Sequence, residues 1–417
     1  MSASRPLARW VSRTSRSDRL SVGELLAVVE DAPPVAAVEV IGELLSQRLG
    51  AAEVSFLIAD FSGQSLVRLG YTAAGASTSD RETAERVPLA GSPYGRALIR
   101  QDVEVVEAAG ETRLYAPVTN RGEAIGVLEL TLPHSPDEQT LADVAMAAHA
   151  LAYVVIANSR YTDLFAWGQR TVKLSLAAEI QHRLLPGTYT CEAGQFTLAA
   201  WLEPAGDVGG DTFDFAMERD TLHLSMTDAM GHEVDAAVLA TVLVGALRNA
   251  RRAQLGLGEQ ARSANDALVG FVDGTGFVTG LVARIDLIGE TATIVNAGHH
   301  PPLRFRDGRV EPVVLDPDLP FGLEADYGHR VQPLPLEPGD RLIFFTDGML
   351  ERNAKELDLH ASICETAEMH ARETVQHLTE AVLTACGGQL RDDAAVMCLD
   401  WHGGPPRHRA SGSGANT

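Results

Sequence analysis

The sequence predicts an α+β protein in which two packed antiparallel sheets flanked by helices follow a smaller α/β domain. Its 417 residues exceed the length of one ordinary domain, so two or three domains are expected. Strand-like runs alternate with helical runs along most of the chain, and hydrophobic residues make up 45% of it, which is enough for well-formed cores.

Charge and cysteine usage narrow the class of protein. The formal net charge is -22, which disfavours nucleic acid or an anionic membrane as the main partner. The four cysteines are scattered and form neither a C-x-x-C motif nor a disulfide framework, as expected of a protein in the reducing cytoplasm. No signal-peptide pattern is recognised in the first residues, and the longest apolar run, Met146 to Ala157, is expected to be too short to cross a bilayer.

Residues 1–20 are rich in Ser and Arg and are predicted to form a disordered arm. Residues 21–157 then mix helices and strands in the pattern of a first domain. The expected elements are a helix over 35–49, strands over 54–60 and 65–71, a hairpin over 114–130 and a long helix from 138 to about 159. The hairpin segment from Tyr115 to Leu130, within this helix–strands–helix order, resembles a GAF sensor domain.

The GAF resemblance leaves the role of the first domain open. The Asn-Lys-x-x-x-Phe-Asp-Glu cluster of cyclic-nucleotide-binding members is not visible, and no cysteine is placed to hold a bilin. Two roles therefore stand side by side. One is a pocket for a small-molecule ligand, and the other is a ligand-free module for dimerisation or docking.

Residues 158–186 are predicted to form a helical linker. Apolar residues recur there at steps of three and four, the spacing of a coiled-coil seam, which favours a homodimer. Thr171 and Gln181 interrupt the seam, so a single amphipathic helix packed on its own domain is the alternative. The segment Ala178 to Pro186 resembles the helix that precedes the catalytic domain in RsbU-like proteins.

Residues 187–402 are predicted to form the catalytic domain, and residues 403–417, rich in Gly, Pro, Ser and Arg, a disordered tail. The expected strands cover 196–202, 221–227, 277–286, 291–297, 341–346 and 394–399, with a hairpin around 306–309. Helices are expected from about 233 and 259, and over much of 353–386.

Acidic residues stand at the edges of these strands. Asp211 follows two glycines, Asp228 and Asp347 directly follow strands that end in Thr, and Asp392-Asp393 precede the last strand. Mg²⁺ and Mn²⁺ prefer oxygen ligands, so carboxylates converging from several strands suit such ions. Taken singly, each Asp reads more readily as a turn former or helix N-cap. Their occurrence together, in this order, carries the prediction of a shared metal site.

Together these segments resemble the type 2C metal-dependent serine/threonine phosphatases, in their SpoIIE/RsbU-like branch. The matching segments are P-A-G-D-V-G-G-D-T-F-D (204–214), T-D-A-M-G-H-E-V-D-A-A (227–237), N-A-G-H-H-P-P-L (296–303), F-F-T-D-G-M-L-E (344–351) and R-D-D-A-A-V (391–396). They span about half of the chain. The branch usually has Gly-His-Gly where this chain has Gly231-His232-Glu233.

The resemblance implies a site for two Mn²⁺ or Mg²⁺ ions. Asp228 would bridge the two ions, and Asp211 with the carbonyl of Ala229 would complete one site. The remaining ligands would be Asp347 and Asp392, with Asp393 as a neighbour.

The implied reaction is hydrolysis by metal-activated water, without a phosphoenzyme. His232 would either protonate the leaving oxygen or only shape its turn. His299 and His300 are expected to be structural or to line the site, because imidazole suits softer metals than this carboxylate set.

By the same resemblance, the substrate would be a phosphorylated anti-sigma-factor antagonist of the STAS class. A catalytically silent scaffold that binds a sigma-regulatory partner is the alternative, although a scaffold needs no converging carboxylates. A metal hydrolase acting on a small phosphoester or nucleotide is a third reading, and it is disfavoured because the chain has no P-loop motif.

Overall fold

The computed structural model describes residues 19–61, 63–73, 85–108, 110–170, 174–203, 209–231, 233–272, 276–350, 357–388 and 390–405. Most of the predicted arm and tail, and the candidate residue His232, lie outside these ranges. The chain forms two compact units, residues 1–172 with 409–417 and residues 173–408, and each unit is described by itself.

The first unit is built on one six-stranded sheet with the order β3-β2-β1-β6-β5-β4. Its strands are β1 (Glu53–Ala59), β2 (Ser65–Ala73), β3 (Arg86–Pro88), β4 (Glu104–Ala108), β5 (Glu111–Asn120) and β6 (Glu123–Leu132). Its helices are α1 (Val22–Glu30), α2 (Ala37–Leu49), α3 (Pro93–Arg100), α4 (Glu138–Asn158) and α5 (Leu164–Gln169).

Alternation along β1 gives this sheet two buried faces. Phe56 and Ile58 belong to the core that includes residues of α1, α2 and α4, whereas Leu57 packs with Tyr94 and Leu98 of α3 on the other face. The short helix α3 therefore covers the face that carries Leu57, and helices α1, α2 and α4 cover the opposite face. The predicted helices and the hairpin of this unit are confirmed.

Helix α4 is longer than the apolar run seen in the sequence. It has 21 residues, and by length and composition it is the one helix in the described part of the chain that could cross a membrane. The expectation that its apolar run is too short is therefore not supported. The helix packs against β5 and buries eight of its residues in the core, as the core helix of a globular domain does.

The continuous linker helix predicted between residues 158 and 186 is not present. Instead, α5 ends at Gln169, Arg170 is extended, and a separate helix α6 (Leu176–Leu184) begins after Ser175. The Ser175 side chain accepts a hydrogen bond from the Ala178 amide and so starts the new helix. Helix α5 packs on β1 and β2, so the coiled-coil spacing reflects two short helices, each with its own apolar contacts.

The second unit contains two antiparallel sheets. The order β15-β12-β11-β10-β9 defines the first, and β14-β13-β16-β17-β8-β7 defines the second. Their strands are β7 (Thr190–Glu192), β8 (Phe196–Glu203), β9 (Asp211–Met217), β10 (Thr221–Ala229), β11 (Val278–Asp286), β12 (Thr291–Ala297), β13 (Leu303–Arg306), β14 (Arg309–Pro312), β15 (Gln332–Pro333), β16 (Arg341–Phe345) and β17 (Ala394–Trp401).

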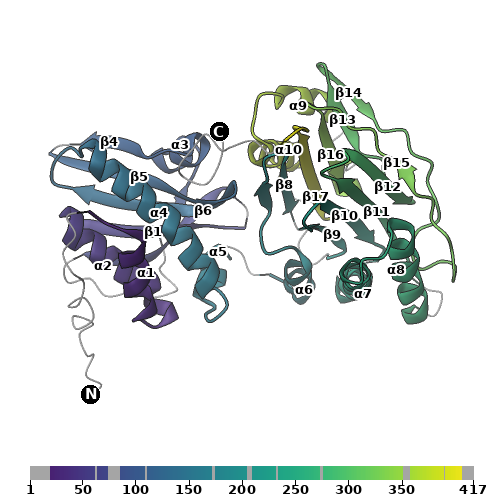
Figure 1. Cartoon of the computed structure of the whole chain (residues 1–417), viewed down its shortest axis with the longest axis horizontal. Coiled ribbons are helices and arrows are strands. Elements are labelled where there is room, and N and C mark those ends of the chain that lie inside the picture. Colours follow the sequence, from purple (N-terminus) through teal and green to yellow (C-terminus); the bar gives the residue numbers. More distant parts are fainter. Residues whose placement is uncertain are drawn as a thin grey trace. The chain divides into compact units, whose positions relative to one another are not determined.

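The two sheets enclose one apolar core, and helices cover their outer faces (Figure 1). Helices α7 (Glu233–Arg252) and α8 (Leu257–Phe271) pack on the β9–β12 sheet, and α6 lies beside α7. Helices α9 (Leu359–Glu365) and α10 (Ala371–Ala385) pack on the sheet that holds β8 and β17. This confirms the predicted sandwich flanked by helices.

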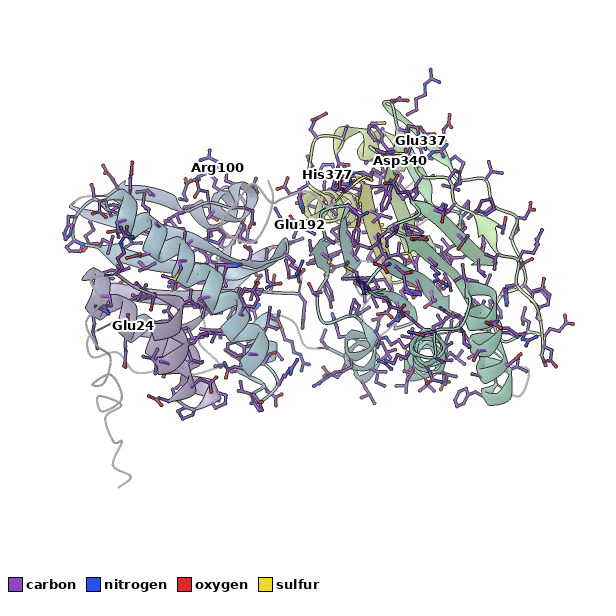
Figure 2. The ribbon with its side chains drawn as sticks, in the orientation of Figure 1. Glu24, Arg100, Glu192, Glu337, Asp340 and His377 are labelled. Carbon is purple, nitrogen blue, oxygen red and sulfur yellow. The ribbon has the colours of Figure 1, made fainter. Side chains whose placement is uncertain are left out.

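Two arginine networks, one of them buried, stabilise the second sheet. Arg306 forms a bidentate pair with Asp340 and also bonds Glu337, and Figure 2 shows these two acids side by side. Arg341 is 6% exposed and donates from two nitrogens to the Asp400 carboxylate, at 2.6 and 2.9 Å. It also donates to the carbonyls that precede α10 and to the Thr374 hydroxyl, so its charge is fully hydrogen-bonded.

Replacement of Arg341 by Ala should therefore destabilise this unit strongly, because it leaves the Asp400 carboxylate without its cation. We expect a loss of about 3–5 kcal/mol in the free energy of unfolding, measured by urea denaturation. The control is Arg309→Ala at the exposed start of β14, which should change stability by less than about 0.5 kcal/mol. Equal losses of unfolding free energy in the two variants would contradict the stabilising role assigned to the Arg341 network.

Candidate metal centre

One edge of the β9–β10 hairpin carries the first two candidate ligands. Asp211 is the first residue of β9, Asp228 is the penultimate residue of β10, and the two are direct register partners. Antiparallel pairing therefore brings together two carboxylates that are 17 positions apart in the sequence. Asp211 is 2% exposed, whereas Asp228 is half-buried.

The carbonyl of Ala229 lies at the same edge. A Cβ atom on Gly210 would come within 2.6 Å of that carbonyl oxygen, so only glycine fits there. The Ala229 amide in turn donates to the Gly210 carbonyl, at 3.3 Å. The glycine before Asp211 therefore lets the two chain segments of the predicted first metal site approach closely.

The second sheet supplies the remaining acids. Asp347 opens a short 3-10 helix, η3 (Asp347–Leu350), directly after β16, and Asp392 and Asp393 precede the neighbouring strand β17. A Cβ atom on Gly348 would stand 1.9 Å from the carbonyl oxygen of Asp393. This glycine lets the η3 turn lie directly on the backbone that carries the two aspartates. Asp347 and Asp392 are exposed, and Asp393 is 1% exposed.

Hydrogen bonds tie the two groups of acids to each other. The Thr346 hydroxyl donates to Oδ2 of Asp211 and accepts from the Ala395 amide. The Gly210 amide donates to Oδ2 of Asp393, at 3.2 Å. The strand ends of the two sheets are thus joined at the carboxylates themselves.

Gln181 of α6 also links the two groups of acids by hydrogen bonds, and this role was not predicted from the sequence. Its side chain is fully buried, and its Nε2 donates to Oδ2 of Asp393 at 2.6 Å and to the main-chain carbonyl of Asp211 at 2.7 Å. The only hint in the sequence was a glutamine that interrupted an otherwise apolar helical seam. Because both bonds link it to distant residues, that hint did not indicate its partners.

The carboxylates raise one another's pKa. Burial, followed by the charges of Asp347, Asp392 and Asp393, raises the pKa of Asp228 to about 7. Burial and the charges of Asp228 and Asp393 hold the pKa of Asp211 well above its usual range, although the bond from Thr346 opposes this. Among the described residues, the charges that act on these two groups are all negative. Asp228 thus lies within electrostatic reach of the four other predicted aspartates.

The donor set fits hard divalent cations. It consists of carboxylate oxygens and one carbonyl, which Mg²⁺ and Mn²⁺ prefer. Within the described ranges, no three His, Cys, Asp or Glu side chains converge tightly enough to enclose an ion. An open arrangement suits Mg²⁺, which keeps several waters and binds through few carboxylates. Asp211, Asp228, Asp347, Asp392 and the Ala229 carbonyl would hold the ions, while Asp393 is engaged by Gln181 and Gly210.

The turn that follows Asp228 departs from the usual Gly-His-Gly at Glu233. Glu233 begins α7 with φ of 58°, in the left-handed region that favours glycine. Its side chain is exposed, and Gly231 also has a positive φ. The chain therefore keeps the backbone geometry of a glycine while carrying a side chain at this position.

Replacement of Glu233 by Gly should relieve that backbone strain. We expect the free energy of unfolding to rise by up to about 1 kcal/mol, measured by chemical denaturation. Asp235→Gly, at an exposed position two residues further along the same helix, is the control and should lose about 1 kcal/mol. A loss of stability in both variants would argue against strain at Glu233.

The raised pKa of Asp228 predicts a pH-dependent effect of metal. Its folded pKa of about 7 lies above the ordinary value of about 3.9, so this group stabilises the metal-free fold at low pH. That contribution is lost as the pH rises through about 7. Mn²⁺ should therefore raise the melting temperature more at about pH 8 than at about pH 5.5, because protons no longer compete with the ion.

Asp228→Asn serves as the matched control in the same melting experiment. Without the ionising carboxylate, the metal-free variant should melt above the unmodified protein at about pH 8. An Mn²⁺ shift of equal size at both pH values would contradict the assignment of these carboxylates as ligands.

Comparisons with known proteins relate the second unit to a family of phosphatases. Residues 218–402 match the family described as Stage II sporulation protein E (SpoIIE). The chain is 24% identical to the phosphoserine phosphatase RsbU of Bacillus subtilis over 235 residues, which are 54% of this chain and 69% of RsbU. It is 21% identical to the phosphoserine phosphatase RsbP of the same species over 240 residues, 55% of this chain and 57% of RsbP.

A solved structure of the RsbU and RsbW domains of a Mycobacterium tuberculosis protein aligns at 25% identity. It covers 51% of this chain and 63% of that chain, with a TM-score of 0.45. The family match begins at residue 218, so the GAF resemblance of the first unit remains a prediction. Residues 218–402 therefore match the SpoIIE family, and the chain is similar to the phosphoserine phosphatase RsbU.

Proposed function

We propose that this protein removes phosphate from serine or threonine of a sigma-regulatory protein, using Mn²⁺ or Mg²⁺. The observation that carries the proposal is the placement of five aspartates at the strand ends of two sheets, where the charges of described residues that act on Asp211 and Asp228 are all carboxylates. Such an arrangement is costly without a bound cation, because burial and the neighbouring negative charges raise the pKa of both Asp211 and Asp228.

The protein's own residues would hold and orient the reacting groups. Asp211, Asp228, Asp347 and Asp392 would bind two ions through oxygen, with the Ala229 carbonyl beside Asp211. When bound, the ions supply a hydroxide near neutral pH and stabilise the charge of the phosphoryl group. Thr346 fixes the orientation of the Asp211 carboxylate by its hydrogen bond. His232 remains the proposed acid for the leaving oxygen, and it lies outside the described residues.

The natural substrate in this proposal is a phosphorylated anti-sigma-factor antagonist of the STAS class. Support comes from the similarity to RsbU, whose own name is phosphoserine phosphatase. We further propose a cytoplasmic protein that is regulated by a small-molecule ligand of its GAF-like first unit. A scaffold without activity would have no use for acids that destabilise each other, which favours the enzyme.

The test is hydrolysis of a phosphoserine peptide and of a generic aryl phosphate by the full chain with Mn²⁺. EDTA should abolish turnover, and Asp228→Asn should lower it by more than about 100-fold, beyond the usual effect of changes outside the ligand shell. Asp307→Asn, at an exposed hairpin tip, is the matched control and should keep full activity.

Two outcomes would redirect the proposal. Metal-dependent turnover of nucleotides but not of the phosphopeptide would favour a small-phosphoester hydrolase. Absence of turnover on every substrate, in a protein that still binds Mn²⁺, would favour the scaffold.

A further inference from the structure

His299 lies buried between the two sheets and bonds to both. Its side chain is 5% exposed. Nδ1 lies 2.8 Å from the Thr279 hydroxyl on β11, and Nε2 lies 3.1 Å from the main-chain carbonyl of Phe345 at the end of β16. The His299 amide also donates to Oδ1 of Asn296, at 2.8 Å, which anchors its backbone to the end of β12.

The partners determine which ring nitrogen carries the proton. A carbonyl oxygen only accepts, so Nε2 must carry the hydrogen that it donates to Phe345. In the neutral ring Nδ1 then accepts, and the Thr279 hydroxyl is the donor. Burial lowers the pKa of His299 to about 4, so the ring is neutral near pH 7 and adds no positive charge next to the metal ligands.

The two ends of this bridge stand next to the two halves of the metal site. Thr279 is the register partner of Asp228 in the β10–β11 pair. Phe345 is followed by Thr346, which bonds Asp211, and then by Asp347. The ring of His300 stacks on the Phe345 ring, with centroids 6.0 Å apart and an interplanar angle of 17°, and supports the same strand end.

We propose that His299 is a positioning residue that sets the separation between the strand end carrying Asp347 and the strand carrying Asp228. The inference rests on the proposed function, because it assigns His299 a role in presenting the metal ligands. Both nitrogens are already bonded to protein atoms, so the ring does not itself bind an ion. Its role is to hold two groups of carboxylates, one on each sheet, at the spacing that two shared ions require.

The test is the affinity of the full chain for Mn²⁺, measured by isothermal titration calorimetry. His299→Ala should raise the dissociation constant by about 10- to 100-fold, the usual effect of losing a group that orients metal ligands. His299→Gln should recover part of that loss, because its amide can still donate to the Phe345 carbonyl. Thr279→Val should also raise the dissociation constant for Mn²⁺. If His299→Ala does not fold, the Thr279→Val variant tests the positioning role in its place.

His329→Ala is the matched control. His329 is also 5% exposed, and its Nε2 bonds a main-chain carbonyl, that of Leu319, at 3.0 Å. The control should lower the melting temperature without changing Mn²⁺ affinity. If His299 had only a structural role, its replacement would also lower the melting temperature without changing Mn²⁺ affinity. Unchanged Mn²⁺ affinity in His299→Ala, or in Thr279→Val if His299→Ala does not fold, would therefore overturn the inference.

The same titration separates this inference from the proposed function. If the unmodified protein binds no Mn²⁺, both fail. If it binds Mn²⁺ and the His299 variants bind it equally well, only the positioning role is lost.

Discussion

Mutual repulsion among buried carboxylates is the constraint on which the rest of the catalytic unit depends. Asp211 and Asp228 would each be better solvated apart, because burial and then the neighbouring negative charges raise the pKa of both. Their positions must therefore be imposed from outside the site. The register of β9 and β10, the packing of two sheets and the ties through Thr346, Gln181 and Gly210 provide that restraint.

The restraint comes from parts of the chain that are far apart in sequence. Gln181 precedes both sheets, and its partner Asp393 immediately precedes the last strand, 212 positions later. The two sheets can keep a fixed spacing only if their shared core is intact. Arg341 stabilises one of these sheets by hydrogen bonds from β16 to the Thr366 carbonyl and to Thr374 of α10. Packing energy from the whole unit thus maintains a polar edge that is unfavourable by itself.

The candidate ligands could be predicted from the sequence because each follows or precedes a strand, and alternation locates strands well. The structure brings these acids together at one edge. The roles of Thr346, Gln181 and His299 could not be predicted, because each depends on contacts between sheets or with α6. The prediction of one continuous linker helix was wrong because the packing partners of a helix are likewise not visible in the sequence. Two short helices on separate cores preserve a helical period across the break before Ser175.

The contact between Gly348 and Asp393 has a consequence for how this gene can vary. Every single-base change that replaces the glycine encoded by a codon either adds a side chain or creates a stop codon. Here any side chain begins 1.9 Å from a main-chain oxygen, which no rotamer can avoid. Codon 348 should thus be intolerant of every missense change, including alanine. A saturation library selected on folding alone would show this depletion, with no phosphatase assay.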